Sequence, residues 1–355
     1  MRVTPPISIT ASKLTSSTAT AVHDPAAYAG STTYAFGAIA KVAADFKIYE
    51  SLAASNTGNT PSTSPLWWRV LGTTEAAYSA GTTYALGDTC SASNRTYESL
   101  AASNLGNALP ISPEIQTTNW IDVGPTNRYA MFDLSANTQT VTASPLTVVI
   151  TPGERINTVG LTGLKANQAV ISATSVLGGG TVYPAVTIDL NTREVADGYD
   201  YAFEPFSTSP GAVIFDIPPY SDIIVTIALT STSGNVKCGS CVLGTYIYLG
   251  DSQYGATNDG LNFSTVTRDL YGNAVLVPRR TLPKTAQKLT VSAARVNKVK
   301  AARVLLNATP ALWTGLDDSD NSYFDMLTIL GVYTQFIIGA VHNDRAEVTL
   351  ALEEI

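Results

Sequence analysis

Tyr49-Glu-Ser-Leu-Ala-Ala-Ser-Asn56 recurs without a single change as Tyr97-Glu-Ser-Leu-Ala-Ala-Ser-Asn104. In both copies the dipeptide Gly-Asn follows after one further residue, as Gly58-Asn59 and Gly106-Asn107. An identical octapeptide with the same residues behind it indicates an internal duplication. The stretch therefore predicts two copies of one small module near the start of the chain.

The duplication extends outward on both sides of the octapeptide. Upstream, Tyr34 corresponds to Tyr84, and downstream Trp68 corresponds to Trp120, although the spacing between the copies changes by a few residues. Such length changes fall between the matching residues, where loops tolerate them. We expect repeat 1 to span residues 27–74 and repeat 2 residues 75–124. Each is predicted to be a three-stranded mini-sheet: a strand around Thr-Thr-Tyr, a strand ending in Tyr-Glu-Ser-Leu and a closing strand that contains Trp.

The aromatic residues of the repeats have two possible roles. Flat aromatic rings could stack on sugar rings, which makes these side chains candidate glycan-binding residues. Alternatively, the same rings form the core, because a module of this size has few other large apolar groups to bury. In the doublet at 67–68 one ring should be exposed, because neighbouring strand residues point to opposite faces. The candidate residues are Trp67, Trp68, Tyr84, Tyr97 and Trp120.

Composition limits the classes of protein that this chain can represent. Of its 355 residues only 14% are charged, and the formal net charge is −7. Few charged residues with much Ser, Thr and Tyr favour strands and turns over surface helices. A negative net charge argues against nucleic acid as a partner. No apolar run reaches the ~18 residues that a membrane-spanning helix needs, so we expect no membrane insertion.

After the repeats, alternation of apolar and polar residues predicts antiparallel strands throughout. We expect a β-sandwich domain, jelly-roll-like, over residues 125–250 and a C-terminal β domain over residues 251–355, with one short helix after Thr285. The fold class is thus all-β. Strands are predicted at 140–143, 146–150, 169–173, 185–190, 223–229, 245–249, 288–292, 301–306, 324–330, 333–338 and 346–352.

The first 26 residues are rich in Ser and Thr and contain Pro5-Pro6. This composition predicts an extended N-terminal arm that can bury little surface by itself. We expect the arm to lie across a neighbouring subunit as an added strand or clamp. The alternative is an unattached tail.

Residues able to carry chemistry are few and scattered. Cys238 and Cys241 have the spacing of a redox or zinc motif, but zinc needs two further ligands, and the histidines His23 and His342 are distant in sequence. The acidic run 316–322 lacks the Gly and Glu of a regular calcium loop. We therefore expect no metal and no cofactor.

Three aspartates, Asp251, Asp259 and Asp269, could form a carboxylate pair for glycoside hydrolysis, or could be turn residues. The sequence holds no Ser nucleophile elbow, no zinc-protease motif, no phosphate loop and no dinucleotide fingerprint. The prediction is that the chain is not an enzyme.

Two resemblances rest on these motifs. The pattern of repeat 2, with Tyr84, Tyr97, Gly106-Asn107 and Trp120, resembles small chitin- and cellulose-binding carbohydrate modules of bacterial hydrolases. The stretch in which those modules place exposed aromatic residues is Leu100–Asn104 here and holds none. The resemblance covers about a quarter of the chain and implies the scaffold of those modules.

Nearly the full length is similar to a type of phage virion protein that has an N-terminal arm, one or more such modules and two β regions. The residues that carry this likeness are Gly124-Pro-Thr-Asn-Arg-Tyr-Ala-Met-Phe-Asp133, Phe215-Asp-Ile-Pro-Pro-Tyr220, Val242-Leu-Gly244, Tyr248-Leu-Gly250, Thr267-Arg-Asp-Leu-Tyr-Gly272 and Arg279-Arg280.

The resemblance implies a structural protein of the phage tail, baseplate or collar, located in the virion and made in the cytoplasm of the host bacterium. Its expected partners are other copies of itself and other tail proteins. The alternative is an adhesin that binds polysaccharide on the host cell surface.

Overall fold

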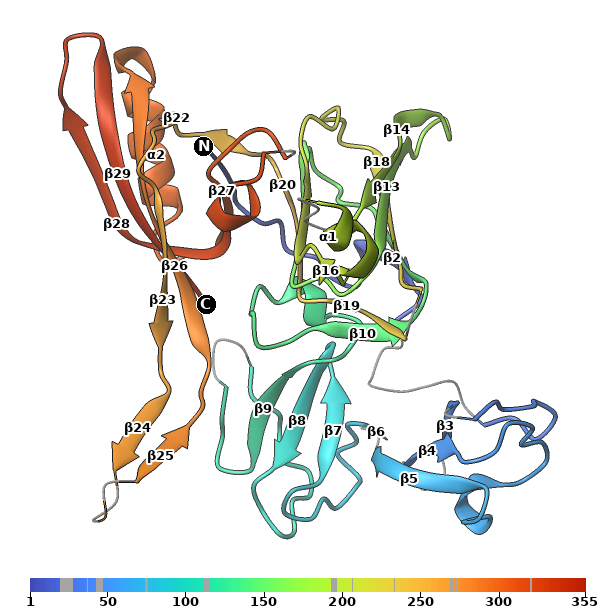
Figure 1. The fold of residues 1–355 in the computed structure, drawn as a ribbon. Helices are drawn as coiled ribbons and strands as arrows, with labels where there is room; N and C mark the ends of the chain where they lie inside the picture. The colour runs from blue at the N-terminus through green and yellow to red at the C-terminus, as the bar shows by residue number, and fades with distance from the viewer. Residues whose placement is uncertain are drawn as a thin grey trace.

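The computed structural model describes residues 1–19, 28–36, 38–42, 47–73, 76–111, 115–192, 197–205, 207–232, 234–268, 271, 273–319 and 321–355. Strands make up 47% of the chain and helices 9%, and several antiparallel sheets are present, so of the predicted all-β class a mostly β fold is confirmed. Figure 1 shows the repeats in blue and cyan, a middle β region in green, and a C-terminal β region in orange and red.

Each repeat forms a small sheet closed by its Trp strand. Repeat 1 pairs its strands in the order β3-β4-β5, and repeat 2 in the order β6-β7-β8-β9, where the short β6 runs parallel to β7. The elements are β3 (Ile39–Val42), β4 (Lys47–Ser51), the 3₁₀ turn η1 (Pro61–Thr63), β5 (Trp68–Thr73), β6 (Ala76–Ala77), β7 (Thr89–Ala92), β8 (Arg95–Ser99) and β9 (Trp120–Pro125).

The strand predicted around Thr-Thr-Tyr is wrong in both repeats. Tyr34 and Tyr84 each make only an isolated bridge, to Asn56 and Asn104. In repeat 2 this segment lies between two tight turns, closed by backbone hydrogen bonds at Thr82 and at Asp88, which leave no room for a ladder. In repeat 1 the first described strand, β3, follows this segment, and in repeat 2 only the two-residue β6 precedes it.

The middle region consists of two larger sheets and two strand pairs. The larger sheets have the orders β14-β13-β18-β11-β2 and β17-β12-β20, and the pairs are β10-β19 and β15-β16. Elements here are β2 (Leu14–Ser17), η2 (Ala130–Phe132), β10 (Thr140–Ala143), β11 (Leu146–Ile150), β12 (Thr158–Thr162), β13 (Gln168–Ser175), β14 (Thr181–Asp189), β15 (Asn191–Thr192), α1 (Gly198–Phe203), β16 (Ser207–Thr208), β17 (Gly211–Ile214), β18 (Ile223–Thr230), β19 (Asn235–Cys238) and β20 (Ser240–Gly244).

One apolar cluster fills the middle region. In β18 every second residue is buried, as period-2 alternation requires of a strand with one face on a core. Val225 and Ile227 from β18 share this cluster with Val159 and Leu161 from β12 of the three-stranded sheet. The two sheets therefore enclose a common core.

The C-terminal region is built on one large antiparallel sheet. Its order is β21-β1-β27-β28-β29-β26-β22, with β23 also paired to β26, and the separate pair β24-β25 extends the β23-β26 hairpin. Elements are β1 (Arg2–Thr4), β21 (Ile247–Tyr248), β22 (Asp251–Ser252), β23 (Thr257–Asn262), β24 (Thr265–Arg268), β25 (Ala274–Val277), β26 (Thr281–Ser292), η3 (Ala293–Arg295), α2 (Val296–Leu305), β27 (Ala311–Thr314), η4 (Asp325–Leu327), β28 (Thr328–Ala340) and β29 (Arg345–Glu354).

Three segments that were predicted as strands have a different structure from the one predicted. The segment 301–306 is wrong as a strand, because it lies in α2 and at its end, and Val299, Ala302 and Leu306 from this helix are buried in the core beneath the sheet. In 324–330 a 3₁₀ turn precedes β28, which starts at Thr328. The segment 245–249 contributes only the two residues of β21, and these pair with β1 instead of joining the middle region.

The N-terminal segment pairs within its own chain. β1 lies between β21 and β27 of the large sheet, and β2 extends the five-stranded sheet beside β11. Met1, Val3 and Ala19 are buried, so residues 1–19 are not the unattached tail of the alternative, and the strands expected to add to a neighbouring subunit pair here with sheets of their own chain. Composition could not reveal this, because each strand completes a sheet made of residues far away in sequence. Residues 20–26 of the predicted arm lie outside the described residues.

The middle and C-terminal regions pack closely on each other. A small apolar cluster combines Val213 and Val242 from the middle region with Leu312 and Leu330 from the C-terminal sheet. At Gly160 a Cβ atom would lie 2.1 Å from Leu312 Cδ2, so glycine permits the contact between β12 and β27. None of the described helices is long and apolar enough to cross a bilayer.

Candidate functional site

The predicted aromatic residues of repeat 2 meet in its interior. Trp120 meets Tyr84 edge to face, with ring centroids 4.9 Å apart and planes at 72°, and Tyr78 stacks on Tyr84 at 6.1 Å. The indole Nε1 of Trp120 donates a hydrogen bond of 3.0 Å to the carbonyl oxygen of Asn107. Aromatic pairs at these distances and a satisfied indole nitrogen are typical of a packed core.

Repeat 1 reproduces this arrangement. Tyr34 and Trp68 meet at 5.0 Å and 72°, and Tyr28 stacks on Tyr34 at 5.7 Å. Trp68 Nε1 donates to the carbonyl oxygen of Asn59 at 2.8 Å. Asn59 and Asn107 belong to the repeated Gly-Asn dipeptides, which therefore accept the hydrogen bond of the core tryptophan.

The last residue of the octapeptide holds the loop in place. Asn104 is buried, and its Nδ2 donates to Ser99 Oγ at 3.0 Å and to the carbonyl oxygen of Asn119 at 2.9 Å. Its Oδ1 accepts from Asn107 Nδ2 at 2.8 Å. Asn56 makes the same contacts in repeat 1. Because a buried amide must satisfy both its donor and its acceptor, Ser and Asn occupy fixed positions in both copies.

Four of the five candidate glycan-binding residues are therefore core residues. Trp68, Tyr84, Tyr97 and Trp120 are all buried, and their ring faces are covered by other side chains of the same repeat. Burial, with the nearby carboxylate of Asp122, raises the pKa of Tyr97. These rings lie in the core of each repeat, as the second of the two roles suggested by the sequence requires.

Trp67 is the exception, with 38% of its surface exposed. Its carbonyl oxygen accepts a hydrogen bond from the backbone N–H of Leu52, which is also exposed, and Leu66 beside it is 88% exposed. These three residues, the Trp67 surface, give repeat 1 an apolar outer face. Repeat 2 carries Asn119 in place of the tryptophan.

The signature Gly124–Asp133 joins repeat 2 to the middle region. The amide of Asn127 exchanges two hydrogen bonds with the backbone of Val141, at 2.8 and 2.9 Å. On the other side, the N–H of Thr126 donates to the carbonyl oxygen of Asn94, in the β7-β8 turn, at 2.8 Å. The residues that carry the phage resemblance thus make a structural junction.

The candidate acidic residues do not converge on one site. Asp251 accepts a hydrogen bond from the hydroxyl of Tyr248, and Asp259 accepts one from the N–H of Gly260. Asp269 lies outside the described residues. Within the described part of the chain, no three metal-ligating side chains cluster.

One acid of the run 316–322 has a role that the sequence did not indicate. Asp317 Oδ1 lies 3.0 Å from Arg2 Nε. The guanidinium of Arg2 also lies over the rings of Phe215 and Tyr246, with its Cζ atom 4.5 and 4.3 Å from their centroids. Arg2 thereby connects β1 to both larger regions, and only the fold brings these four residues together.

The two cysteines of the possible metal motif are core residues. Cys238 and Cys241 are free thiols on β19 and β20, packed in the core of the middle region. Burial raises the pKa of Cys238 to about 12 and the pKa of Cys241 well above its ordinary value. Burial therefore disfavours the thiolate form in which cysteine binds zinc. His342 lies in the exposed turn between β28 and β29, and His23 lies outside the described residues.

A groove of about 570 Å³ lies where the middle region meets the C-terminal region. Its lining includes Tyr183, Phe215 and Phe324, and the carboxylate of Asp325 accepts a hydrogen bond from Ser209 Oγ at 3.0 Å. Grooves between domains are common ligand sites. The sequence did not indicate this groove, because it forms from segments distant along the chain.

Comparison with known proteins finds no matching protein family and no matching curated protein.

Proposed function

We propose that this chain is a structural protein of a bacteriophage virion, in the tail, baseplate or collar, which assembles as a symmetric oligomer and presents its repeats outward. The observation that supports this most is the division of the chain into a broad two-part β body and two small repeats with closed cores at one side of it (Figure 1). Such an architecture offers large surfaces for packing between subunits.

Two details support the same proposal. The phage-like signature residues build the junction that holds repeat 2 against the body, which is a structural role and not a catalytic one. The candidate catalytic aspartates make separate local contacts. We also propose that residues 125–250 form a jelly-roll-like sandwich, because their two larger sheets enclose one core.

The experiment is to locate the chain in purified phage particles. Antibodies raised against the purified chain should label one end of the tail in electron micrographs, and the chain should sediment with the particle. A chain that stays in the soluble fraction of lysed cells, with no labelled particles, would contradict the proposal.

A second function, adhesion to glycans of the host surface, is favoured by one observation: Trp67 is 38% exposed on repeat 1, beside the exposed residues Leu52 and Leu66. An exposed indole can stack on the apolar face of a pyranose. On a glycan array, wild-type protein should bind a saccharide and Trp67→Ala should lose that binding. The matched control is Leu105→Ala, which removes an exposed apolar side chain from repeat 2. Equal binding by wild type and Trp67→Ala would reject this function for the Trp67 surface.

A further inference from the structure

The hairpin β24-β25 is not covered by any described part of the chain. Its strands pair only with each other, from Thr265 opposite Val277 to Arg268 opposite Ala274. All side chains of β24 are exposed, as are those described for β25. An isolated two-stranded hairpin is marginally stable in water, because it has no sheet or helix to cover its faces. We call residues 265–268 and 273–277, with Arg279, the arm.

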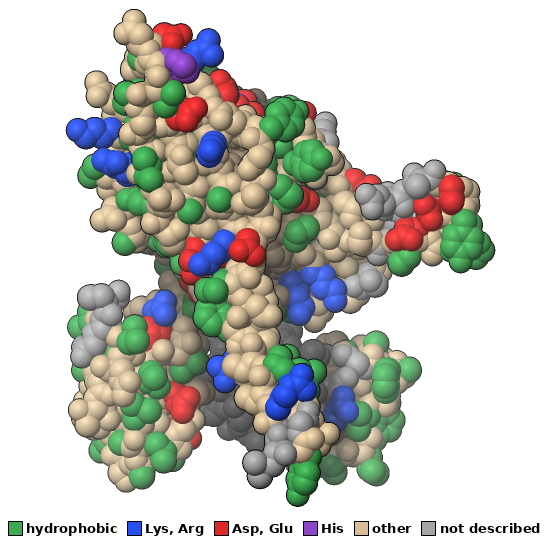
Figure 2. All heavy atoms as spheres, turned by 60° about the vertical axis from the view of Figure 1, so that its left-hand side comes forward, with side chains coloured by type: hydrophobic (Ala, Val, Ile, Leu, Met, Phe, Trp, Pro, Cys, Tyr) green, Lys and Arg blue, Asp and Glu red, His purple; other side chains and the backbone are tan. Residues whose placement is uncertain are grey.

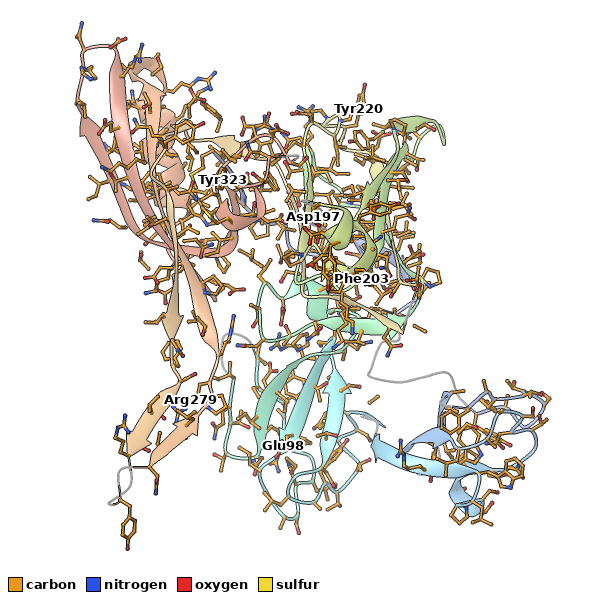
Figure 3. All side chains as sticks on the ribbon, viewed as in Figure 1. Glu98, Asp197, Phe203, Tyr220, Arg279 and Tyr323 are labelled. Carbon is orange, nitrogen blue, oxygen red and sulfur yellow. The ribbon has the colours of Figure 1, made fainter. Side chains whose placement is uncertain are left out.

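The exposed surface of the arm is apolar and positively charged. Val266 is 64% and Leu276 67% exposed, and Phe263 at its base is exposed as well. Within the described residues 261–282 every charged side chain is an arginine. Arg280 contacts Glu354 in its own chain, at 3.4 Å, whereas Arg279 is exposed at the base of the arm (Figure 3). Figure 2 shows blue and green side chains along this projection.

A second projection has the opposite character. Residues 197–205, which we call the knob, contain α1, and α1 buries none of its own residues. Tyr199, Tyr201 and Phe203 are each about 70% exposed, and the rings of Tyr199 and Phe203 lie 4.8 Å apart. The charged residues of the knob are all acidic, namely Asp197, Asp200 and Glu204.

The knob and the arm leave the body at different places. In Figure 2 the knob is the projection with red and green side chains at the right, and the arm descends at the front. Figure 3 likewise separates Asp197 and Phe203 from Arg279. One surface is apolar and basic, and the other is aromatic and acidic. Arginine side chains bind both carboxylates and aromatic faces, so the two surfaces are complementary in charge and in chemistry.

We propose that the arm of one copy docks on the knob of the next copy. Such a contact joins two different surfaces, so it is heterologous and produces a ring when the rotation between copies closes. The occupant of each surface is therefore a second copy of this chain. This inference rests on the proposed function, because it specifies the contact that builds the symmetric oligomer.

The test uses two variants of the full chain, each with one damaged surface. The arm variant carries Val266→Ser, Leu276→Ser and Arg279→Glu, and the knob variant carries Tyr199→Ser, Phe203→Ser and Glu204→Lys. Circular dichroism should show that both keep the wild-type fold, because all six side chains are exposed. The matched control is Leu177→Ser, an exposed apolar residue in the turn between β13 and β14.

Oligomer mass is then measured by light scattering after size exclusion. Wild type and Leu177→Ser should form one discrete oligomer, while each variant alone should dissociate, with at least a ~10-fold rise in its dissociation constant. Mixed in equal amounts, the two variants should form a dimer, because the arm variant keeps an intact knob and the knob variant keeps an intact arm.

The possible failures differ in meaning. If wild type forms an oligomer that both variants retain, the arm and knob contact is wrong while the proposed oligomeric function stands. If wild type is a monomer at all concentrations, both proposals fail. Variants that dissociate but form no mixed dimer would overturn the heterologous contact.

Discussion

The two repeats share an interior and differ in what surrounds it. Their tyrosine and tryptophan rings meet at nearly equal distances, 5.0 Å in repeat 1 and 4.9 Å in repeat 2, and at the same angle of 72°. The amides of Asn56 and Asn104 have equivalent partners. The shared contacts account for the buried residues of the unchanged octapeptide, Tyr49, Ser51 and Asn56 in repeat 1, because a core of four rings has few other residues to compensate for a change.

The outer faces have diverged. Repeat 1 exposes Trp67, whereas repeat 2 has Asn119 at that position. In repeat 2 the β7-β8 turn also accepts a hydrogen bond, from the N–H of Thr126 at the start of the next region. The comparison teaches that the internal contacts limit sequence change in these modules, while exposed positions are free to acquire separate roles.

The largest effect should come from removing the central tryptophan of either repeat. Replacing a buried tryptophan with alanine costs about 3–5 kcal/mol, which exceeds what so small a core can lose. We expect Trp68→Ala to unfold repeat 1 alone, and Trp120→Ala to unfold repeat 2 and loosen its junction. Limited proteolysis with mapping of the cut sites measures this. The matched control Trp67→Ala should change stability by less than ~0.5 kcal/mol; equal cleavage in Trp67→Ala and Trp68→Ala would contradict the packing described.

A smaller loss is expected at the buried amides. Asn56→Ala and Asn104→Ala each remove the hydrogen bonds of a buried amide and leave Ser51 Oγ or Ser99 Oγ without its donor, which costs about 1–3 kcal/mol. Because the two networks are equivalent, the losses should agree to within ~0.5 kcal/mol. Hydrogen exchange of the two loops, followed by mass spectrometry, measures both at once. The exposed neighbours Ser55→Ala and Ser103→Ala are the controls, and clearly unequal losses would show that the repeats are not energetically equivalent.

The smallest effect concerns Cys90, whose counterpart in repeat 1 is Ala40. Burial raises the pKa of the Cys90 thiol to about 11 from its ordinary value of 9.0. Between these pH values the unfolded module loses the proton and the folded module keeps it, so rising pH favours unfolding of repeat 2. Below pH 9 no such effect is expected. Cys90→Ala should remove this contribution to the loss of stability at high pH. The measurement is the rate of proteolysis of repeat 2 from pH 8 to 11, and the same dependence of that rate on pH in both proteins would contradict the prediction.

The sequence predicted those features that depend on neighbours along the chain. The alternation in 146–150 and 223–229 identified strands of the middle region correctly. The prediction failed at 301–306, because a short apolar run fits a helix or a strand equally well; only the spacing of Val299, Ala302 and Leu306 indicated the helical face. For the candidate site, the doublet 67–68 correctly predicted one exposed ring. The arm and the knob were missed, because exposure is a property of the whole fold.

By itself the sequence determined the duplication, the closing tryptophan strands and the mostly β class, because each depends on local patterns and on residue types that must pack together. The tertiary structure alone decided the place of the N-terminal segment. β1 and β2 complete sheets whose other strands lie far along the chain, and the Arg2 guanidinium lies among Phe215, Tyr246 and Asp317. Strand pairing and ion pairing join residues that are distant along the chain. The local sequence of a strand therefore does not show which sheet edge it will pair with.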